Sequence, residues 1–339
     1  MNVLVTGGAG FIGSHLVDRL IKDGHQVTVV DKSKANIRRN LGVEDAGFDR
    51  AGLRTYHCDI NDIHSLSNLG QFDWIVHCAA MADIVPSIEN PVEYHNSNVN
   101  GTVSVLEFAK KHPIKKFIYV ASSSCYGNTA KVPTQETEKI DCKYPYALSK
   151  WIGEEYVMHW ARVYGLPAIS LRLFNVYGPR SRTTGAYGAV FGVFLKQKLD
   201  GKPYTVVGSG SQSRDFIYVD DVVDAFILAL NSDKKGQVYN VGTGQHVSIR
   251  NLINLLGSTN GIEYSPERPG EPDITMAWTA KIQQDLRFFP KTTFQQGVKK
   301  MLEHIKDYAD APLWTKEKIN VATKVWFERL GDQNERQLR

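Results

Sequence analysis

Two side chains of this sequence, Tyr146 and Lys150, have the types and the spacing that proton transfer requires. They lie in the stretch Tyr144–Lys150, which opens a helix that is predicted to end near Tyr164. Residues four apart share one helical face, so the phenol and the ammonium lie side by side. A neighbouring positive charge favours the phenolate and lowers the tyrosine pKa, so that the tyrosine can act as a general base near neutral pH. The same spacing is also common in ordinary surface pairs.

A hydroxyl group suited to assist such a base follows the strand predicted for Lys116–Val120. Ser122 comes directly after it, within the run Ala121–Gly127. In a parallel sheet, ligands bind at the edge where the strands end. A serine at that edge favours the catalytic interpretation of Tyr146 and Lys150, provided that a cofactor site lies there too.

A glycine-rich turn at the start of the chain supplies that cofactor site. The apolar strand predicted within Met1–Thr6 runs into Gly7, Gly10 and Gly13, and helical periodicity begins at once with Phe11 and Ile12. Strand, glycine turn and helix together form a dinucleotide-binding unit. Glycine adopts the positive φ of a tight turn, and its missing side chain lets the backbone reach a pyrophosphate at the helix N-terminus.

The acidic residue after the second predicted strand selects the dinucleotide. The strand Gln26–Val30 ends at Asp31, eighteen residues beyond Gly13. A carboxylate there accepts hydrogen bonds from the ribose hydroxyls and repels a 2′-phosphate, which favours NAD over NADP. The basic residues Lys32, Arg38 and Arg39 lie nearby and oppose that preference, but NAD is the predicted cofactor. Its nicotinamide cation is expected to act together with Lys150 in lowering the pKa of Tyr146.

Two further strands end in residues that suit the same ligand. The predicted strand Thr55–Ile60 ends in Asp59 and Ile60, which can flank an adenine ring. Asp59 equally suits the N-cap of a following helix, and both roles are compatible. The predicted strand Trp74–Ala80 ends in Ala79 and Ala80, whose small side chains let the chain pass close to a pyrophosphate.

Strands alternate with helices along the first half of the chain. Apolar periodicity predicts a helix over Pro91–Lys111, in which Asn98 precedes Gly101, and a glycine inside a helix indicates close packing. The segment 34–54 is polar and predicted to be rich in loops. The alternation predicts an α/β fold, a Rossmann-type doubly wound parallel sheet with helices on both faces. Gly7, Asp31, Ala79 and Ser122 then share the carboxyl edge of that sheet.

Bulk properties exclude several other classes of protein. The 339 residues carry a formal net charge of +4, and the basic residues are dispersed rather than gathered into a nucleic-acid-binding stripe. No apolar run approaches the roughly 18–20 residues of a membrane span, and Met1–Gly13 lacks the pattern of a signal peptide. The 4 cysteines and 10 histidines show no metal-binding spacing, so we expect no metal site and a cytoplasmic protein with reduced thiols.

With these motifs in order, the sequence resembles the extended short-chain dehydrogenase/reductase family, and within it the nucleotide-sugar epimerases and dehydratases. The likeness runs from Thr6 to about Leu302 and so covers most of the chain. Besides the glycines, Asp31 and Asp59–Ile60, it rests on these stretches: His77–Ala80, Asn98, Ser122–Gly127, Tyr146–Lys150, Leu171–Pro179, Ser213–Asp221 and Arg268–Glu271.

The resemblance implies a role for each matching residue. Tyr146 is the base, Lys150 holds the nicotinamide ribose, and Ser122 hydrogen-bonds the reacting sugar oxygen. Asn175 contacts the sugar diphosphate, while Arg268 and Glu271 close the nucleotide end. Arg214 contacts the diphosphate or a ribose, for which its guanidinium fork is suited, although a surface ion pair with Asp215 is the alternative. The predicted cofactor-binding residues are Gly7, Gly10, Phe11, Ile12, Gly13, Asp31, Lys32, Asp59, Ile60, Ala79, Ala80, Asn98, Tyr146 and Lys150.

The implied reaction depends on two serines beside Ser122. In the family's 4,6-dehydratases an Asp–Glu pair stands at the positions of Ser123 and Ser124, and in its sugar-acid decarboxylases a Glu stands at that of Ser124. Serine cannot replace a carboxylate in acid–base chemistry at neutral pH, so both activities are disfavoured. The resemblance then implies a 4-epimerase that oxidises the sugar at C4 and returns the hydride to the opposite face. Alternatives are a reductase or dehydrogenase that exchanges free NAD(H), and a non-catalytic NAD-binding regulator.

Other positions bear on the nucleotide base and the sugar. Val207 stands where family members often carry an aromatic residue, and Val190 and Phe191 stand where uridine-type epimerases present Asn and an apolar residue. Uracil is the first choice of base, with cytosine, guanine and thymine left open. Ser123 also faces the predicted substrate. Thr275 lies near a position where a bulky residue restricts the sugar pocket, so the small threonine leaves room for an N-acetyl group.

The chain is predicted to divide into two interlocked domains. An NAD-binding domain spans residues 1–174, with about 211–239 returning to it, and a smaller α/β substrate domain is assembled from 175–210 and 240–310. Residues 311–339 form a C-terminal helix and tail, in which Thr315 caps a helix that ends near Gly331. That helix either docks on the domain or binds a partner. The resemblance implies a homodimer through the helices near 91–111 and 147–164.

Overall fold

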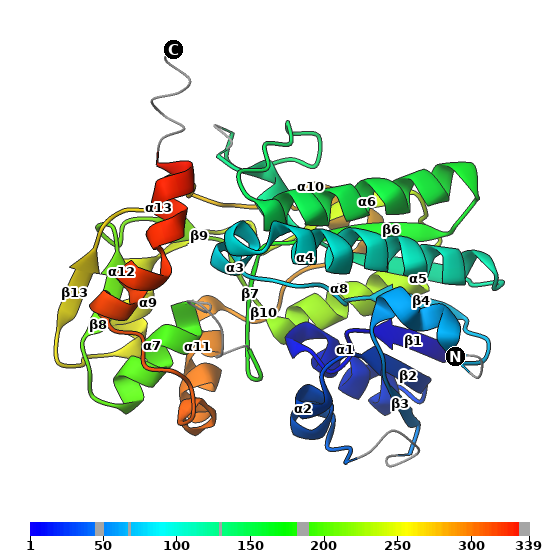
Figure 1. Ribbon diagram of the computed structural model, residues 1–339, viewed down its shortest axis with the longest axis horizontal. Helices are drawn as coiled ribbons and strands as arrows, with labels where there is room; N and C mark the ends of the chain where they lie inside the picture. Colours follow the sequence, from blue (N-terminus) through cyan, green and yellow to red (C-terminus); the bar gives the residue numbers. More distant parts are fainter. Residues whose placement is uncertain (45–50, 67–68, 129–130, 182–189, 332–339) are drawn as a thin grey trace.

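A seven-stranded sheet forms the centre of the molecule. The structure, a computed structural model, describes residues 1–44, 51–66, 69–128, 131–181 and 190–331. The strand order is β11-β6-β5-β4-β1-β2-β3, and every pairing is parallel (Figure 1). The strand order reverses between β1 and β4, which makes the carboxyl ends of these two strands the expected ligand site. The strands are β1 (Asn2–Thr6), β2 (Gln26–Asp31), β3 (Leu53–His57), β4 (Trp74–His77), β5 (Lys116–Ser122), β6 (Ala168–Leu173) and β11 (Gln237–Val241).

Helices cover both faces of this sheet. In β1, Val3 and Val5 face one apolar cluster and Leu4 faces the other, because alternate residues of a strand point to opposite faces. The first cluster is completed by α1 (Phe11–Lys22), α8 (Val219–Asn231) and α10 (Ala280–Leu286), and the second by α5 (Gly101–Lys110) and α6 (Pro145–Val163). The doubly wound Rossmann-type fold predicted from the sequence is therefore confirmed.

Several connections differ in detail from the predictions. The segment 34–54 is not only loop: α2 (Lys34–Asn36) and a π-helical turn, Ile37–Leu41, pack against the sheet through Ile37 and Leu41. The helix predicted over 91–111 consists of α4 (Pro91–His95), a π-helical turn at Asn96–Asn100, and α5. Gly101 does mark close packing, because a Cβ there would lie 2.5 Å from Cδ1 of Ile60.

The smaller part of the molecule has its own apolar core. Phe191, Phe216 and Phe294 gather around Tyr177, and the ring of Phe191 stacks on Tyr177 at 4.6 Å. The strand pairs here are β7 (Asn175–Tyr177) with β10 (Phe216–Tyr218), β8 (Tyr204–Val207) with β13 (Ile262–Ser265), and β9 (Ser213–Arg214) with β12 (Val247–Ser248). The helices are α7 (Val190–Leu199), α9 (Ile249–Leu256) and α11 (Phe294–Glu303). Within the segment 211–239, α8 and most of β11 return to the large sheet, whereas β9 and β10 pair in the smaller part.

The C-terminal segment forms two helices rather than the one predicted. Thr315 caps the first as expected, since its hydroxyl accepts a hydrogen bond from the Lys318 amide at 3.4 Å. This helix ends at Thr323. The hydroxyl of Thr323 donates to the carbonyl of Ile319 at 2.8 Å, a local hydrogen bond that competes with regular helix. The two helices are α12 (Lys316–Ala322) and α13 (Lys324–Leu330), and the predicted tail at 332–339 lies outside the described residues.

The docked interpretation of this segment is the one that the structure supports. The side chains of Trp326 and Leu330 are buried against Val85 of α3 (Ile84–Glu89).

Within the described ranges, no helix combines the length and apolar character needed to cross a bilayer, and no cluster of side chains is arranged to bind a metal ion. The four cysteines, Cys58, Cys78, Cys125 and Cys142, are free thiols.

Candidate active site

The glycine turn brings the ends of β1 and β4 into direct contact. Gly7 has φ +68°, and a Cβ on it would lie 2.6 Å from the backbone N and Cα of Ala79. A Cβ on Gly13 would lie 2.4 Å from the carbonyl oxygen of Gly7, so the helix also approaches the turn too closely for a side chain. Gly10, the N-cap of α1, supplies no side-chain cap, which leaves amide groups at the helix start available to an anion. Phe11 and Ile12 form the first turn of that helix.

Asp31 lies at the end of β2, beside this turn. Its Oδ2 accepts a hydrogen bond from the Ala9 amide at 3.0 Å, and its Oδ1 accepts one from the Ser33 amide at 2.9 Å. Burial raises the pKa of the carboxyl group, and these two amides partly oppose that rise. Asn40 holds the same turn from the other side, because its amide donates to the carbonyl of Ala9 at 2.8 Å. No pattern in the sequence pointed to Asn40, which lies in the segment predicted to be rich in loops.

The other predicted cofactor residues line the same edge or support it. Ala79 abuts Gly7, as the prediction from small side chains requires, and Ala80 follows it exposed. Asn98 is buried behind this loop: its Oδ1 accepts from the Met81 amide at 2.7 Å and its Nδ2 donates to the Ser149 hydroxyl at 2.9 Å. The structure thus gives Asn98 a positioning contact.

Two residues after β3 and one after β2 complete the predicted cofactor set. Asp59 caps the 3-10 helix Ile60–Ser65, with its Oδ1 accepting from the Asn61 amide at 2.9 Å, so the helix-cap interpretation of this residue is confirmed. Ile60 itself is buried. Lys32 is exposed, and its carbonyl bonds the imidazole of His57 at 3.1 Å. The adenine-flanking role of Asp59 and Ile60 stays a prediction.

Ser122 and Tyr146 meet at the end of β5. The side chain of Ser122 faces the phenol of Tyr146 and lowers its pKa, and the Oγ of Ser122 lies 2.8 Å from the Oγ of Ser124. Lys150, one helical turn beyond Tyr146, is buried with its Nζ 4.3 Å from the ring centre of Tyr119. Ser122 and Tyr146 therefore meet where β5 ends and α6 begins, and Lys150 is buried one turn further along α6.

The pKa of Tyr146 is raised, not lowered, in the protein without a bound cofactor. Burial raises the pKa of the phenol, and the bond from Ser122 only partly lowers it. Burial also lowers the pKa of Lys150 to about 8. In the protein by itself desolvation of the phenol dominates, and the Lys150 ammonium lies over the ring of Tyr119, so the lowered pKa of Tyr146 stays a prediction for the NAD-bound enzyme.

A buried ion pair fixes the helix that carries Tyr146 and Lys150. Glu154, one turn beyond Lys150, receives both the guanidinium of Arg172, with Nε at 3.1 Å, and the hydroxyl of Ser170 at 2.7 Å. The Nη1 of Arg172 also donates to the hydroxyl of Tyr126 at 2.8 Å. This network joins α6 to β6 and to the turn after Ser122. Only Arg172 and Tyr126 lay in recognised motifs, and nothing in the sequence paired them with Glu154.

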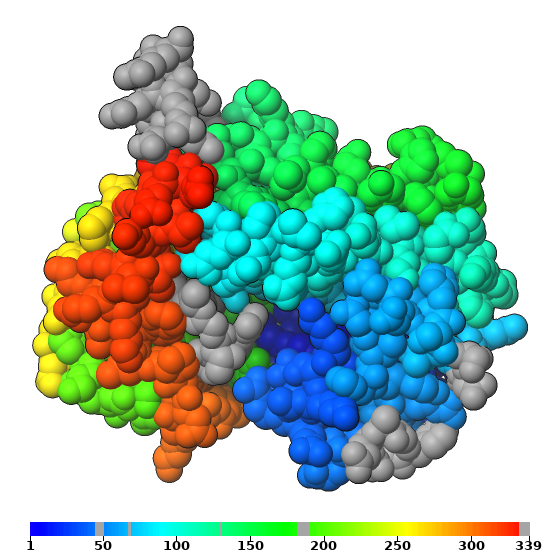
Figure 2. Space-filling model, viewed as in Figure 1, coloured from blue at the N-terminus to red at the C-terminus, as the bar shows by residue number. Residues whose placement is uncertain are grey.

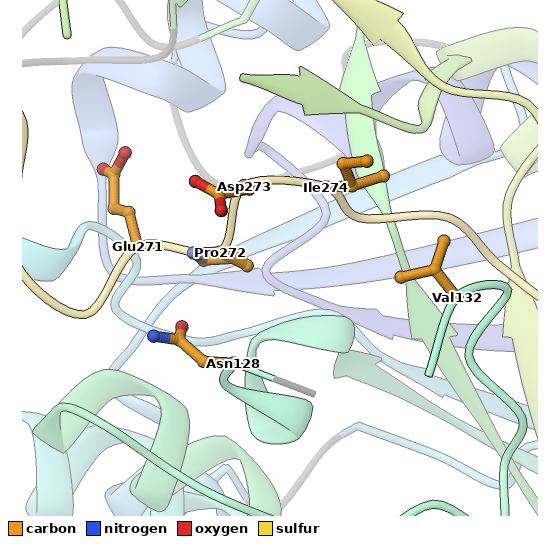
Figure 3. Close-up of a pocket in the computed structure, with 6 residues that line it drawn as sticks. All are labelled: Asn128, Val132, Glu271, Pro272, Asp273 and Ile274. Carbon is orange, nitrogen blue, oxygen red and sulfur yellow. The ribbon is translucent and has the colours of Figure 1, made fainter. Parts of the chain in front are cut away.

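Three charged residues meet at the predicted nucleotide end. Glu271 receives Nη2 of Arg214 at 3.4 Å and Nη1 of Arg268 at 2.9 Å. The alternative pairing of Arg214 with Asp215 is wrong: the Asp215 carboxylate is buried and accepts from the amides of Thr243, at 2.8 Å, and Ala277, at 3.0 Å. Beside Glu271 the surface is hollowed by about 320 Å³, lined also by Asn128, Val132, Pro272, Asp273 and Ile274 (Figure 3).

The remaining predicted substrate residues fall into two groups. The exposed Asn175 lies at the start of β7, where its Oδ1 accepts a hydrogen bond from the Thr275 hydroxyl at 3.4 Å, so these two predicted positions are neighbours. Ser123 is half-buried in the turn after β5. Phe191, in contrast, is 2% exposed within the aromatic core, and Val207 is 8% exposed in β8. The side chain of Phe191 serves that core, while Val190 at the start of α7 is half-buried.

Known proteins share both the sequence pattern and this arrangement. Residues 3–242 match the NAD dependent epimerase/dehydratase family. The chain belongs to this family. A curated relative from Methanocaldococcus jannaschii, a putative UDP-glucose 4-epimerase, is 33% identical over 309 residues, which cover 90% of this chain and 98% of the relative. A UDP-N-acetyl-alpha-D-glucosaminuronate decarboxylase from Bacillus cytotoxicus is 31% identical, covering 90% of this chain and 97% of that one.

The fold of a solved relative agrees closely. The crystal structure of UDP-glucose 4-epimerase from Thermotoga maritima with UDP-glucose has a TM-score of 0.84 and 34% identity, and the match covers 91% of this chain and 99% of that one. The protein is thus an NAD-dependent epimerase. Its residues fit that cofactor, since Gly7 and Gly13 leave a cradle that a Cβ would fill and Asp31 lies beside it.

Proposed function

We propose that this enzyme is a 4-epimerase of nucleotide-diphosphate sugars, of the UDP-hexose or UDP-N-acetylhexosamine type. The observation that carries the proposal is that Ser122 and Tyr146 face each other where β5 ends and α6 begins, with Ser124 beside Ser122 and with Lys150 buried one helical turn beyond Tyr146. That group can move a proton to and from a sugar hydroxyl. It has no carboxylate at the serine positions where the family's dehydratases and decarboxylases carry one, and this favours epimerisation over the decarboxylation named for one relative.

The proposed chemistry assigns one task to each residue. Tyr146 takes the proton from the sugar 4-hydroxyl and returns it, and Ser122 orients that hydroxyl through its own bond to the phenol. Lys150, one turn beyond Tyr146 on the same helix, would hold the nicotinamide ribose. Bound NAD⁺ supplies the hydride acceptor and a positive charge, which is needed because burial by itself raises the pKa of Tyr146. No net oxidation occurs, so the reaction requires no exchange of the cofactor.

The other end of the site supports a nucleotide diphosphate. Two guanidinium groups, Arg214 and Arg268, share Glu271 and match the geometry of phosphate oxygens. Uracil is the first choice of base, because the Thermotoga maritima epimerase was solved with UDP-glucose and the Methanocaldococcus jannaschii relative is named as a putative UDP-glucose 4-epimerase. Thr275, beside Asn175, is small enough to leave room for an N-acetyl group on the sugar.

We also propose a homodimer and a cytoplasmic location. Apolar side chains are exposed along two adjacent helices: Val92 on α4, and Leu148, Tyr156 and Val163 on α6. Burying them against a second copy would remove apolar surface from water. Four free thiols suit a reducing compartment. Light scattering on the purified protein tests the dimer, and a monomeric mass at micromolar concentration would contradict it.

Turnover on a panel of nucleotide sugars tests the function. UDP-glucose, UDP-N-acetylglucosamine and UDP-glucuronate are offered to the protein and to Tyr146→Phe, with the exposed Tyr264→Phe as the matched control. We expect Tyr146→Phe to lose epimerisation but keep NAD, and the control to keep both. Full activity in Tyr146→Phe would refute the assignment. NAD retained through gel filtration supports an epimerase, whereas a requirement for added NAD(H) with net oxidation or reduction supports the alternative of a dehydrogenase.

A further inference from the structure

The C-terminal segment touches both halves of the molecule. We call residues 312–331 the C-terminal strap. On the smaller part, the side chain of Gln197 in α7 donates to the carbonyl of Trp314 at 2.7 Å, and α12 lies against β13. On the larger part, Trp326 and Leu330 of α13 pack against Val85 of α3. In Figures 1 and 2 the strap lies beside α3 and the smaller part at once.

The contact with α3 lies near the cofactor edge. The helix α3 begins at Ile84, directly after the loop that leaves Ala79, which abuts the glycine turn. Within that loop, Asp83 has φ +83°, a conformation that non-glycine residues rarely adopt. The strap therefore packs against the helix that follows this constrained loop.

Trp326 reaches from the strap to the nucleotide end. Its indole Nε1–H donates to the carbonyl of Pro269 at 2.8 Å, and the guanidinium carbon of Arg268 lies 5.3 Å from its ring centre. The ring also lies 6.2 Å from that of Tyr144, which in turn stacks on Tyr146 at 6.5 Å and 4°. Trp326 is 1% exposed, so its ring is buried among these neighbours and the side chains of α3.

Arg268 depends on such a support because its side chain is long and flexible. Holding it in one position costs conformational entropy, and a flat aromatic face that attracts the cation offsets that cost before a ligand arrives. Arg268 then presents Nη1 to Glu271 at 2.9 Å, and Glu271 also receives Arg214. The order of contacts is thus Trp326, Arg268, Glu271, Arg214.

We propose that Trp326 is a positioning residue that holds Arg268 at the nucleotide end, so that the C-terminal strap sets the affinity for the nucleotide diphosphate. This inference rests on the proposed function, because it takes the nucleotide diphosphate as the ligand of Arg214 and Arg268. The residue touches none of the glycine turn, Ser122 and Tyr146 directly, whereas it does touch Arg268, so we expect its main effect on nucleotide affinity.

Two substitutions of Trp326 separate the ring from its N–H group. Trp326→Phe keeps an aromatic face for Arg268 but loses the bond to Pro269, and Trp326→Leu loses both. The control is Val325→Ala, which weakens packing of the strap on α3 without touching Arg268. Each full-length protein is titrated with UDP by calorimetry, its KM and kcat are measured on the best sugar of the panel, and its NAD content and melting temperature are recorded.

A graded loss of nucleotide affinity is the expected result. The dissociation constant for UDP and KM should rise about tenfold in Trp326→Leu and less in Trp326→Phe, since a partly buried cation–π contact and one hydrogen bond are lost in turn. The kcat and the NAD content should stay near those of the parent, and Val325→Ala should bind UDP normally. Unchanged UDP affinity in both Trp326 variants would overturn the inference, as would an equal loss of affinity in Val325→Ala.

Failure of the proposed function gives a different pattern. If the parent protein turns over a nucleotide sugar and binds UDP, but the Trp326 variants behave like it, only the role of Trp326 is wrong. If the parent binds none of UDP, CDP, GDP and dTDP, the proposed function is wrong and this role falls with it. If Trp326→Leu does not fold, the test is the dissociation constant for UDP in the other two variants: weaker binding in Trp326→Phe than in Val325→Ala supports the inference, and equal binding overturns it.

Discussion

Alanine substitutions of three glycines would measure how closely the cofactor cradle is built. At Gly7 a methyl group meets two obstacles, because φ is +68° and its Cβ would lie 2.6 Å from the backbone of Ala79. At Gly13 the Cβ would lie 2.4 Å from the Gly7 carbonyl, but the conformation is an ordinary helical one. At Gly24, φ is +84° and nothing lies within 4 Å. The three positions thus represent strain with a clash, a clash alone, and strain alone.

The structure sets the expected magnitudes. A left-handed conformation costs an alanine about 1–2 kcal/mol, and an extra methyl group in a packed site costs about 1–3 kcal/mol. Gly24→Ala should therefore lose only the first amount of unfolding free energy, and Gly7→Ala about 2–5 kcal/mol. To restore the ordinary contact range of 3.4–4 Å, Ala79 must retreat from Gly7, which parts β1 from β4 where the pyrophosphate is expected.

The assay combines bound NAD with stability. NAD is released from each purified variant by denaturation and quantified against protein, and unfolding free energies come from urea titrations. We expect Gly7→Ala and Gly13→Ala to purify with little or no NAD and Gly24→Ala to keep the parent's content. The reasoning is refuted if Gly7→Ala retains NAD at the parent ratio, or if Gly24→Ala loses as much bound NAD as Gly7→Ala does.

Two further predictions concern buried polar groups. His77 is buried between the hydroxyls of Thr6 and Thr102, and burial lowers its pKa to about 3. The unfolded chain binds this proton near pH 6.5, so the free energy of unfolding should fall from there toward pH 3 by up to about 1.4 kcal/mol per pH unit. Urea titrations at several pH values should show that the unfolding free energy of His77→Asn falls less steeply with falling pH. The same pH dependence in both proteins would contradict this. Glu154→Ala leaves the charge of Arg172 buried and should cost about 3–5 kcal/mol, against less than about 0.5 kcal/mol for the exposed neighbour Glu155→Ala; similar losses would contradict the importance of this ion pair.

The elements in the first half of the fold could be predicted from local patterns in the sequence. Strand, glycine turn and helix are encoded by residues close together, so β1, α1 and β2 and the place of Asp31 could be predicted from periodicity and turn chemistry. The motif residues Ser122, Tyr146 and Lys150 were found in the same way, and the sheet then placed them at one edge. The type of cofactor follows from the glycine turn and Asp31, and the class of enzyme was implied by the family resemblance that these residues carry.

Only the tertiary structure decided which distant groups meet. Arg214 pairs with the distant Glu271 and not with its chain neighbour Asp215. Likewise Arg172 pairs with Glu154, and the ring of Trp326 lies against Arg268. The pKa of Tyr146 is likewise set by burial, which spacing along a helix does not reveal. Chemical type and local spacing are properties of a few neighbouring residues, whereas pairing, burial and their electrostatic consequences arise only when segments far apart in the chain pack together.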